Sequence, residues 1–238
     1  MIVLTFDNLG EAAEIQLGAE PDERGSHFSV TDVLPRLLDA LDERELHVTF
    51  FVEGLNTELY PDALREMAGR GHELGYHAWC HEEWGELDAG AQAGNLRRGA
   101  EAFERLGLRP RGFRPPGGAL DSGGERALAE LGFAYASPEG DEPAAGDVAR
   151  MPFRWPLVDA YWVLPSFAER READGHEEGI AGFAAEVDRA IEAGGYVPLI
   201  LHPFLWADPE TERAELEVLD RVARAGAQRM GDAAGSLA

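Results

Sequence analysis

Lysine is absent from this chain of 238 residues, and all 21 of its basic residues are arginine. Against them stand 45 acidic residues, so the formal net charge at neutral pH is -24. A surface this acidic repels phosphate groups, which argues against nucleic acids and anionic membranes as partners. The charge favours solubility and does not identify a substrate.

Cysteines and long apolar runs are also scarce. The single cysteine, Cys80, excludes an internal disulfide. No apolar run reaches the roughly 18 residues that a membrane-spanning helix needs. The first residues lack the basic segment and apolar stretch of a secretory signal. These absences predict a cytoplasmic protein.

Hydrophobic residues make up 45% of the sequence, which is enough for a large buried core. Short, almost continuous apolar runs alternate with amphipathic segments along the chain. Strands are predicted at 2–6, 47–52, 73–77, 112–116, 133–137, 161–165 and 196–202. Helices are predicted at 31–41, 61–71, 87–106, 122–131, 178–193 and 209–224, and a surface loop at 139–149. This alternation predicts an α/β fold with a parallel sheet, in one domain spanning residues 1–238.

Polar side chains occur where the predicted strands end. In parallel α/β folds, ligands bind beyond the carboxyl ends of the strands. Five predicted strands end at such residues, which are Asp7 with Asn8, Glu53, His77, Arg114 and His202. We therefore expect most of these side chains to meet at one mouth of the sheet.

His77 and His81 are four residues apart, so on a helical turn both imidazoles would face the same side. This spacing is typical of a metal-binding pair, although two surface histidines would give the same pattern. Cys80 lies between them and would complete a His-Cys-His zinc set, but a lone buried thiol is the more common situation.

Each of the other candidates also has a purely structural explanation. Asp7 would serve as a cap, with Arg114 as its partner in an ion pair, and His202 would pack at the end of its strand. Taken together at one mouth of a barrel, these residue types instead indicate a hydrolytic site, because amide hydrolysis needs an activated water and a proton for the leaving nitrogen.

Several motifs resemble those of the polysaccharide deacetylase family, the carbohydrate esterases that share the chitooligosaccharide deacetylase homology domain. The matching stretches are LTFDN, TFFVEG, GHELGYHAWCH, GFRPPGG and LILHP, in the family's order, from residue 1 to about 204. The resemblance implies a distorted parallel (β/α) barrel of about seven strands. It also implies a hydrolase that deacetylates an N-acetylated sugar or amino-sugar conjugate, cleaving a carbon–nitrogen bond other than a peptide bond.

The resemblance also assigns roles to individual residues. Asp7 corresponds to the catalytic base, and Arg114 to the arginine that orients it. His202 corresponds to the general acid, and Asp159 to the acid that supports this arrangement from a late strand. The divalent metal, which we expect to be zinc, with cobalt or nickel as alternatives, would be held by Asn8, His77 and His81.

The sequence departs from the family pattern at two important positions. Asn8 replaces the aspartate that binds the metal, so we expect weaker metal affinity, because an amide oxygen coordinates a cation without the attraction of a charge. Gly117 stands where the family often has an aromatic residue, although its backbone N–H would still serve as an oxyanion donor.

These departures leave two alternatives open. One is a metal-independent amidase or imidase, similar to allantoinases, that acts on a small cyclic amide. The other is a catalytically silent relative that binds carbohydrate. The expected ligand in every case is a small molecule or an oligosaccharide. Four tryptophans would either stack on sugar rings at the mouth or belong to the core, and these are Trp79, Trp84, Trp162 and Trp206.

Overall fold

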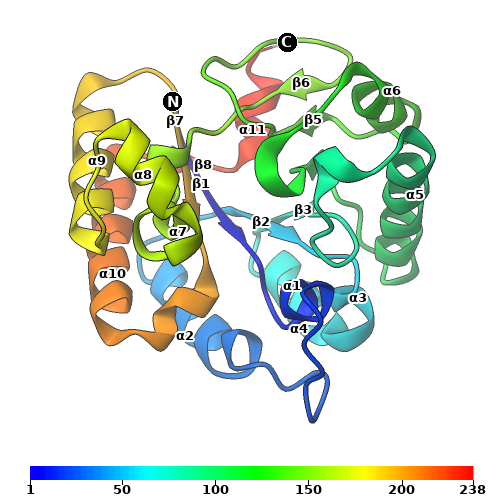
Figure 1. The fold of residues 1–238 in the computed structure, drawn as a ribbon, viewed down its shortest axis with the longest axis horizontal. Coiled ribbons are helices and arrows are strands. Elements are labelled where there is room, and N and C mark those ends of the chain that lie inside the picture. The colour runs from blue at the N-terminus through cyan, green and yellow to red at the C-terminus, as the bar shows by residue number, and fades with distance from the viewer. Residues whose placement is uncertain (238) are drawn as a thin grey trace.

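A parallel β-sheet, curled into a half-barrel, forms the centre of the molecule (Figure 1). The computed structural model describes residues 1–237, so the final residue of the predicted domain, Ala238, lies outside the described chain. Neighbouring strands follow the order β6-β5-β4-β3-β2-β1-β7, and β8 also pairs with β1. The strands are β1 (Ile2–Asp7), β2 (Thr49–Val52), β3 (Glu73–Tyr76), β4 (Gly112–Phe113), β5 (Tyr135–Ala136), β6 (Ala149–Arg150), β7 (Val197–Leu201) and β8 (Ala227–Gln228).

Every pairing between these strands is parallel, as the alternating sequence predicts. Strands β1, β2, β3 and β7 are buried along their whole length, which explains why they read as continuous apolar runs rather than as alternating ones. On the far side of β7, a parallel bridge joins Val158 to Ile200. This bridge continues the curl of the sheet beyond β7, and the expected distorted parallel barrel is confirmed.

Helices cover the outside of the curl, with α9 and α10 on one side and α5 and α6 on the other (Figure 1). The longer helices are α2 (Leu34–Asp42), α4 (Pro61–Gly69), α5 (Ala89–Arg105), α6 (Ser122–Glu130), α9 (Ile180–Ala193) and α10 (Pro209–Ala225). The shorter ones are α1 (Ala12–Gln16), α3 (Asn56–Leu59), α7 (Asp159–Val163), α8 (Ala168–Asp174) and α11 (Met230–Gly235). All six predicted helices are present. The shorter helices were not predicted, because they have too few turns to show a hydrophobic period.

The strand predicted at 161–165 is wrong. Residues Asp159–Val163 form the buried helix α7. A short apolar run does not distinguish a buried strand from a buried helix, and here Tyr161 and Trp162 are buried from a helix instead.

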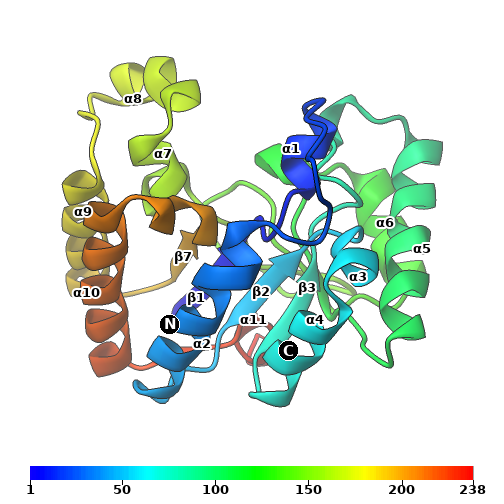
Figure 2. The same cartoon turned by 90° about the horizontal axis from the view of Figure 1, so that it is seen from below.

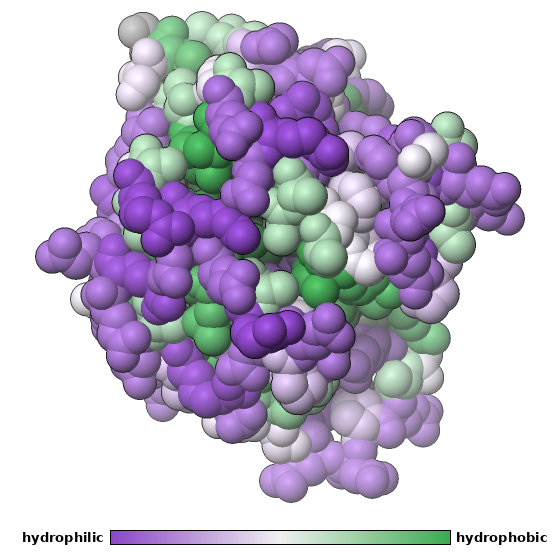
Figure 3. All heavy atoms as spheres, turned by 90° about the vertical axis from the view of Figure 1, so that its left-hand side faces the viewer, coloured by the Kyte–Doolittle hydropathy of each residue, from purple (hydrophilic) through white to green (hydrophobic). Residues whose placement is uncertain are grey.

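Two small helical units rise above the carboxyl ends of the strands. Figure 2 shows α1 above one side of the sheet, and α7 with α8 above the other. Hydrophilic residues predominate on the face over α9 and α10, around small apolar areas, as the excess of acidic residues leads one to expect (Figure 3). Within residues 1–237, none of the helices has the length and apolar content that a bilayer span needs.

Helix α5 packs closely on β3 through a glycine. Tyr76 at the end of β3 is fully buried, and its hydroxyl donates a hydrogen bond of 2.7 Å to Oδ1 of Asn95. A Cβ atom at Gly99 would lie 2.1 Å from Cζ of the Tyr76 ring. This contact sets the position of β3 immediately before His77, so the packing of α5 bears directly on the site.

Replacing Gly99 by alanine should therefore destabilise the protein. We expect Gly99→Ala to lower the free energy of unfolding by about 1–3 kcal/mol, because the buried Tyr76 ring has to move. Gly94 lies on the same helix with nothing within 4 Å of its Cβ position. Gly94→Ala is thus the matched control and should leave stability unchanged or raise it by up to about 1 kcal/mol. Urea denaturation measures both, and equal effects would contradict this account of the packing.

Candidate active site

A cavity of about 680 Å³ opens at the carboxyl ends of the strands. It is lined by six of the seven residues that the sequence nominated for the site, namely Asp7, Asn8, His77, His81, Arg114 and His202. The seventh, Asp159, lies directly behind His202. Glu53, which also ends a predicted strand, is fully buried outside the lining and accepts a hydrogen bond of 3.1 Å from Asn56 Nδ2.

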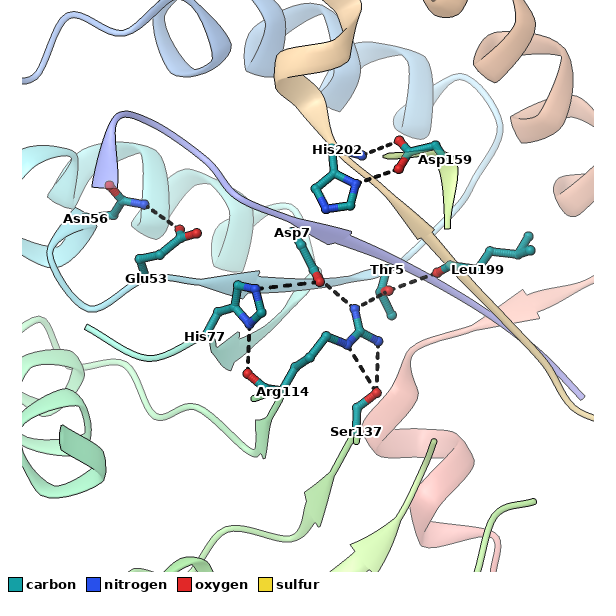
Figure 4. A network of polar contacts seen from close by, with 10 residues as sticks. All are labelled: Thr5, Asp7, Glu53, Asn56, His77, Arg114, Ser137, Asp159, Leu199 and His202. Atoms are coloured by element: carbon teal, nitrogen blue, oxygen red, sulfur yellow. Dashed lines mark hydrogen bonds and ion pairs between the residues drawn. The ribbon is translucent and has the colours of Figure 1, made fainter. Parts of the chain in front are cut away.

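Asp7 and Arg114 form a buried ion pair at the floor of this cavity (Figure 4). The distance from Nη1 of Arg114 to Oδ1 of Asp7 is 2.7 Å. Nη1 also donates to the hydroxyl of Thr5 at 2.8 Å, and Nε and Nη2 both donate to the hydroxyl of Ser137. The guanidinium carbon lies 4.1 Å from the centre of the Phe51 ring. These contacts leave the guanidinium no freedom to turn away from Asp7.

The same arginine fixes the ring of His77 through its backbone. The carbonyl oxygen of Arg114 accepts a hydrogen bond of 2.7 Å from Nδ1 of His77, so the proton of a neutral imidazole lies on Nδ1. Its Nε2 then carries a lone pair and lies 3.9 Å from Oδ2 of Asp7. Burial is the main cause that lowers the pKa of His77 to about 3, so the ring is neutral at physiological pH.

His81 lies next to His77, but not through a helical turn. The rings are 4.9 Å apart between centroids, as the four-residue spacing suggested. The expectation of a helix was wrong, because Ala78 and His81 adopt left-handed conformations with φ of 61° and 65° in an irregular turn. Burial, followed by the neighbouring His77, lowers the pKa of His81 to about 3. Two neutral imidazoles therefore face the cavity together.

Asn8 lines the same cavity as these two rings. It has a φ of 56°, a left-handed conformation that asparagine and aspartate tolerate better than most residues. Its Oδ1 atom is buried and has no hydrogen-bond donor in the part of the chain that the structure describes. An amide oxygen in this condition suits a cation as its partner, because a buried acceptor without a partner is costly.

A conventional metal cluster is not formed by the residues described here. No group of three His, Cys, Asp or Glu side chains within residues 1–237 is arranged to hold an ion. Cys80 is therefore not a third ligand beside the two histidines, and burial raises the pKa of its thiol to about 11. The donors that remain are two imidazoles and the Asn8 amide.

His202 lies at the end of β7, with Asp159 behind it (Figure 4). The bridge between Val158 and Ile200 places the two residues side by side. Nδ1 of His202 donates to Oδ1 of Asp159 at 2.5 Å, and the backbone N–H of His202 donates to Oδ2 at 2.6 Å. Burial alone would lower the pKa of His202, but the charge and hydrogen bond of Asp159 outweigh it, so the pKa is raised.

Apolar side chains form the walls of the cavity. Ala13 and Leu17 come from the region of α1, whereas Phe167 belongs to η5 (Pro165–Phe167) and Phe204 to η6 (Pro203–Ala207). The four tryptophans considered from the sequence all belong to the core, because none is more than 5% exposed: Trp79, Trp84, Trp162 and Trp206. The tryptophan that does line the cavity is Trp155, which the sequence did not single out.

Two further residues of the site were not found from the sequence. Thr5 and Ser137 both bind the Arg114 guanidinium. Thr5 lies two positions before Asp7, and residues two apart on a strand share a face. The sequence could therefore have indicated that Thr5 lies beside Asp7. Ser137 follows the short strand β5, and only the pairing of β5 with β4 brings it to Arg114.

Known proteins resemble this chain over part of its sequence. Residues 1–136 match the sequence profile of the family described as Polysaccharide deacetylase. A chitin deacetylase of Colletotrichum lindemuthianum is 32% identical over 105 residues, which are 42% of this chain and 42% of that protein. A peptidoglycan-N-acetylglucosamine deacetylase of Bacillus cereus is 30% identical over 87 residues, 36% of this chain and 32% of that protein. The matched stretch is thus less than half the length of either relative.

A solved structure extends the likeness beyond the profile. A protein of Mycobacterium smegmatis, described as a polysaccharide deacetylase, superposes with a TM-score of 0.82 and 28% identity. The superposition covers 99% of this chain and 89% of that one. The profile match itself covers 136 of the 238 residues, and Asp7, His77 and Arg114 lie within it. The chain belongs to the polysaccharide deacetylase family.

Proposed function

We propose that this protein hydrolyses the amide of an N-acetylated sugar or amino-sugar conjugate and releases acetate. The observation that carries the proposal is the pairing of two differently supported groups across one cavity. Asp7 is held by an arginine, and His202 is held by a carboxylate. One group suits removal of a proton from water, and the other suits donation of a proton to the leaving nitrogen. The deacetylases among its relatives support the same reaction class.

Asp7 acts first in this proposal. A water molecule that attacks the amide carbonyl must lose a proton, and a carboxylate within hydrogen-bond reach accepts it. The Arg114 guanidinium holds one oxygen of Asp7 at 2.7 Å, which leaves the other oxygen directed towards His77 and the cavity. Arg114 therefore orients the base instead of contacting the substrate.

The residues beside Asp7 fit a divalent ion. The lone pair of His77 Nε2, the neutral ring of His81 and the orphaned Oδ1 of Asn8 would hold it, with zinc as the expected ion. When bound, such an ion acidifies water and polarises the amide carbonyl. The ligand set has no negative charge of its own, so the protein should hold the ion more weakly than a set with a carboxylate would.

His202 completes the reaction. Its Nδ1 proton is committed to Asp159, so Nε2 is the nitrogen that carries a proton to the substrate. Collapse of the tetrahedral intermediate breaks the carbon–nitrogen bond, and the amine takes that proton as it leaves. Asp159 favours the charged imidazolium, and its charge and hydrogen bond raise the pKa of His202.

Replacement of His202 tests the proposal. We expect wild-type protein to release acetate from N-acetylated chitooligosaccharides or peptidoglycan fragments, and His202→Ala to lower the rate by roughly 10²- to 10⁴-fold. Zinc affinity should stay unchanged, because His202 is not among the proposed ligands. Full activity in His202→Ala would mean that another residue protonates the amine, and release from a cyclic amide alone would favour the imidase alternative.

The pH dependence follows from the raised pKa of His202. The acid works only while it is protonated, so activity should fall as the pH rises through this pKa. Asp159→Asn removes the charge that supports the imidazolium, and the alkaline limb should move to lower pH by about one unit or more. The pH–rate profile measures the shift, with the exposed Asp147→Asn as control. An unmoved alkaline limb would contradict the pairing of His202 with Asp159.

The amide at position 8 can be tested without any substrate. Asn8→Asp should tighten zinc binding about tenfold or more, because one added charge at contact distance is worth at least ~1.4 kcal/mol. Asn8→Gly accepts the same left-handed backbone, removes the ligand and should weaken binding. Calorimetric titration of chelator-treated protein compares the three.

Two outcomes of that titration would count against the assignment. Equal affinity in all three proteins would mean that Asn8 does not touch the ion. No binding in any of them would mean that the two histidines do not form a metal site, and a metal-independent reaction would be the better account.

A further inference from the structure

The cavity has apolar walls that the proposed reaction does not explain. On one side it is lined by Phe153, Trp155 and Phe167, which we call the aromatic wall. The ring centroids of Phe153 and Trp155 are 5.2 Å apart, and those of Trp155 and Phe167 are 4.9 Å apart. On the other side, Ala13 and Leu17 line it from the region of α1, across from α7 and α8 (Figure 2). Proton transfer needs polar groups, so these walls indicate a part of the substrate beyond the reacting amide.

Contacts behind the aromatic wall hold it in place. The guanidinium carbon of Arg170 lies 5.1 Å from the centre of the Trp155 ring, and Nη2 of Arg170 pairs with Oε1 of Glu139 at 2.5 Å. Arg171 is 2% exposed, and its Nη1 donates to the carbonyl oxygen of Leu164, directly before η5, at 2.8 Å. A wall already fixed in this way need not be ordered on binding, so an apolar group that packs on it keeps more of the free energy of its burial.

Exposed apolar side chains also gather at the mouth of the cavity. Within residues 1–237, the large hydrophobic residues that remain exposed are Met1, Leu17 and Phe28. Leu17 lines the cavity and is 89% exposed. Phe28 packs on His27, another lining residue, with ring centroids 4.6 Å apart. On a chain with a net charge of -24, such a grouping beside a cavity indicates a ligand with an apolar part.

The charges of the lining disfavour an anionic ligand. Glu14 and Glu83 line the cavity in addition to Asp7. Among the lining residues that the structure describes, Arg114 is the single arginine, and each of its side-chain nitrogens already donates a hydrogen bond inside the protein. A phosphate or carboxylate group would therefore meet acidic side chains and no free guanidinium. A ligand without negative charge fits this lining.

We propose that the substrate is a neutral N-acetylated glycoside with an apolar aglycone, and that the aglycone lies between the aromatic wall and Leu17. The cavity volume of about 680 Å³ lies within the range of about 300–1,000 Å³ that is usual for small-molecule sites. The identity of the reacting amide rests on the proposed function, whereas binding of the aglycone requires no hydrolysis. Leu17 and Phe167 are thus assigned as residues that determine specificity.

Calorimetric titration of the full chain with two glucosamine glycosides tests this proposal without any reaction. The hexyl and methyl glycosides have the same sugar, which carries no acetyl group to be hydrolysed, and they differ only in the length of the aglycone. We expect the hexyl glycoside to bind at least about tenfold more tightly, because burial of about two further CH₂ groups already gives this factor. Equal affinity for the two, or no binding of the hexyl glycoside, would overturn the proposal.

A phosphorylated ligand tests the charge of the lining. A 6-phosphate on the hexyl glycoside should weaken its binding about threefold or more, because the added anion meets the acidic side chains of the lining. Binding of the phosphorylated glycoside as tightly as the unmodified one, or more tightly, would overturn the assignment of a neutral substrate.

Variants of the two walls test where the aglycone lies. Leu17→Ser and Phe167→Ala should each weaken binding of the hexyl glycoside about threefold or more and leave binding of the methyl glycoside unchanged. Ala19→Ser adds a hydroxyl group on the same exposed segment, outside the cavity lining, and is the control. An unchanged preference for the hexyl glycoside in Leu17→Ser, or in a folded Phe167→Ala, would contradict the proposed position.

The leucine variant keeps the test valid if Phe167→Ala fails to fold, because the Leu17 side chain is almost fully exposed. Failure of the wild type to release acetate from any N-acetylated glycoside would refute the proposed function and leave the binding preference intact. A lost preference with acetate release retained would refute only the inference about the aglycone.

Discussion

The buried pair of Arg114 and Asp7 is the interaction on which the rest of the site depends. Arg114 is 1% exposed, and its side chain joins β1 to the end of β5 through Asp7, Thr5 and Ser137. Its backbone carbonyl also sets the tautomer of His77. Removing one partner of a buried pair leaves an uncompensated charge, at a cost of about 3–5 kcal/mol. Only the planar guanidinium, with its several N–H groups, satisfies all of these acceptors at once, which lysine would not do.

The mouth of the sheet combines this rigid floor with strained connections. Four non-glycine residues of the described chain have a positive φ, and three of them follow strands at the site, namely Asn8, Ala78 and His81. Such conformations cost about 1–3 kcal/mol each and persist where surrounding structure enforces them. Here they turn the chain sharply after β1 and β3, so that side chains in the turns still face the cavity. The strain therefore serves the placement of the candidate ligands.

The sequence predicted most of this site because the signals were local. Buried parallel strands have continuous apolar runs. Asp7, His77, Arg114 and His202 could be predicted directly, because they lie where these runs end. Predictions failed where tertiary contacts decide the outcome. Residues 161–165 became a helix, and the turn at 78–81 owes its shape to positive φ angles. The cavity walls near α1 and Trp155 were not predicted either, because tertiary contacts place them at the cavity.

The central claim is that the acid, the base and their supports across one cavity hydrolyse an N-acetyl group. The most direct test follows the carbonyl carbon of a ¹³C-acetyl-labelled chitooligosaccharide by NMR during incubation with the protein. We expect the amide signal to be replaced by that of free acetate, and Asp7→Asn, shown by thermal melting to be folded, to abolish this conversion. Label that stays in the amide with the wild type, or equal conversion by the variant, would contradict it.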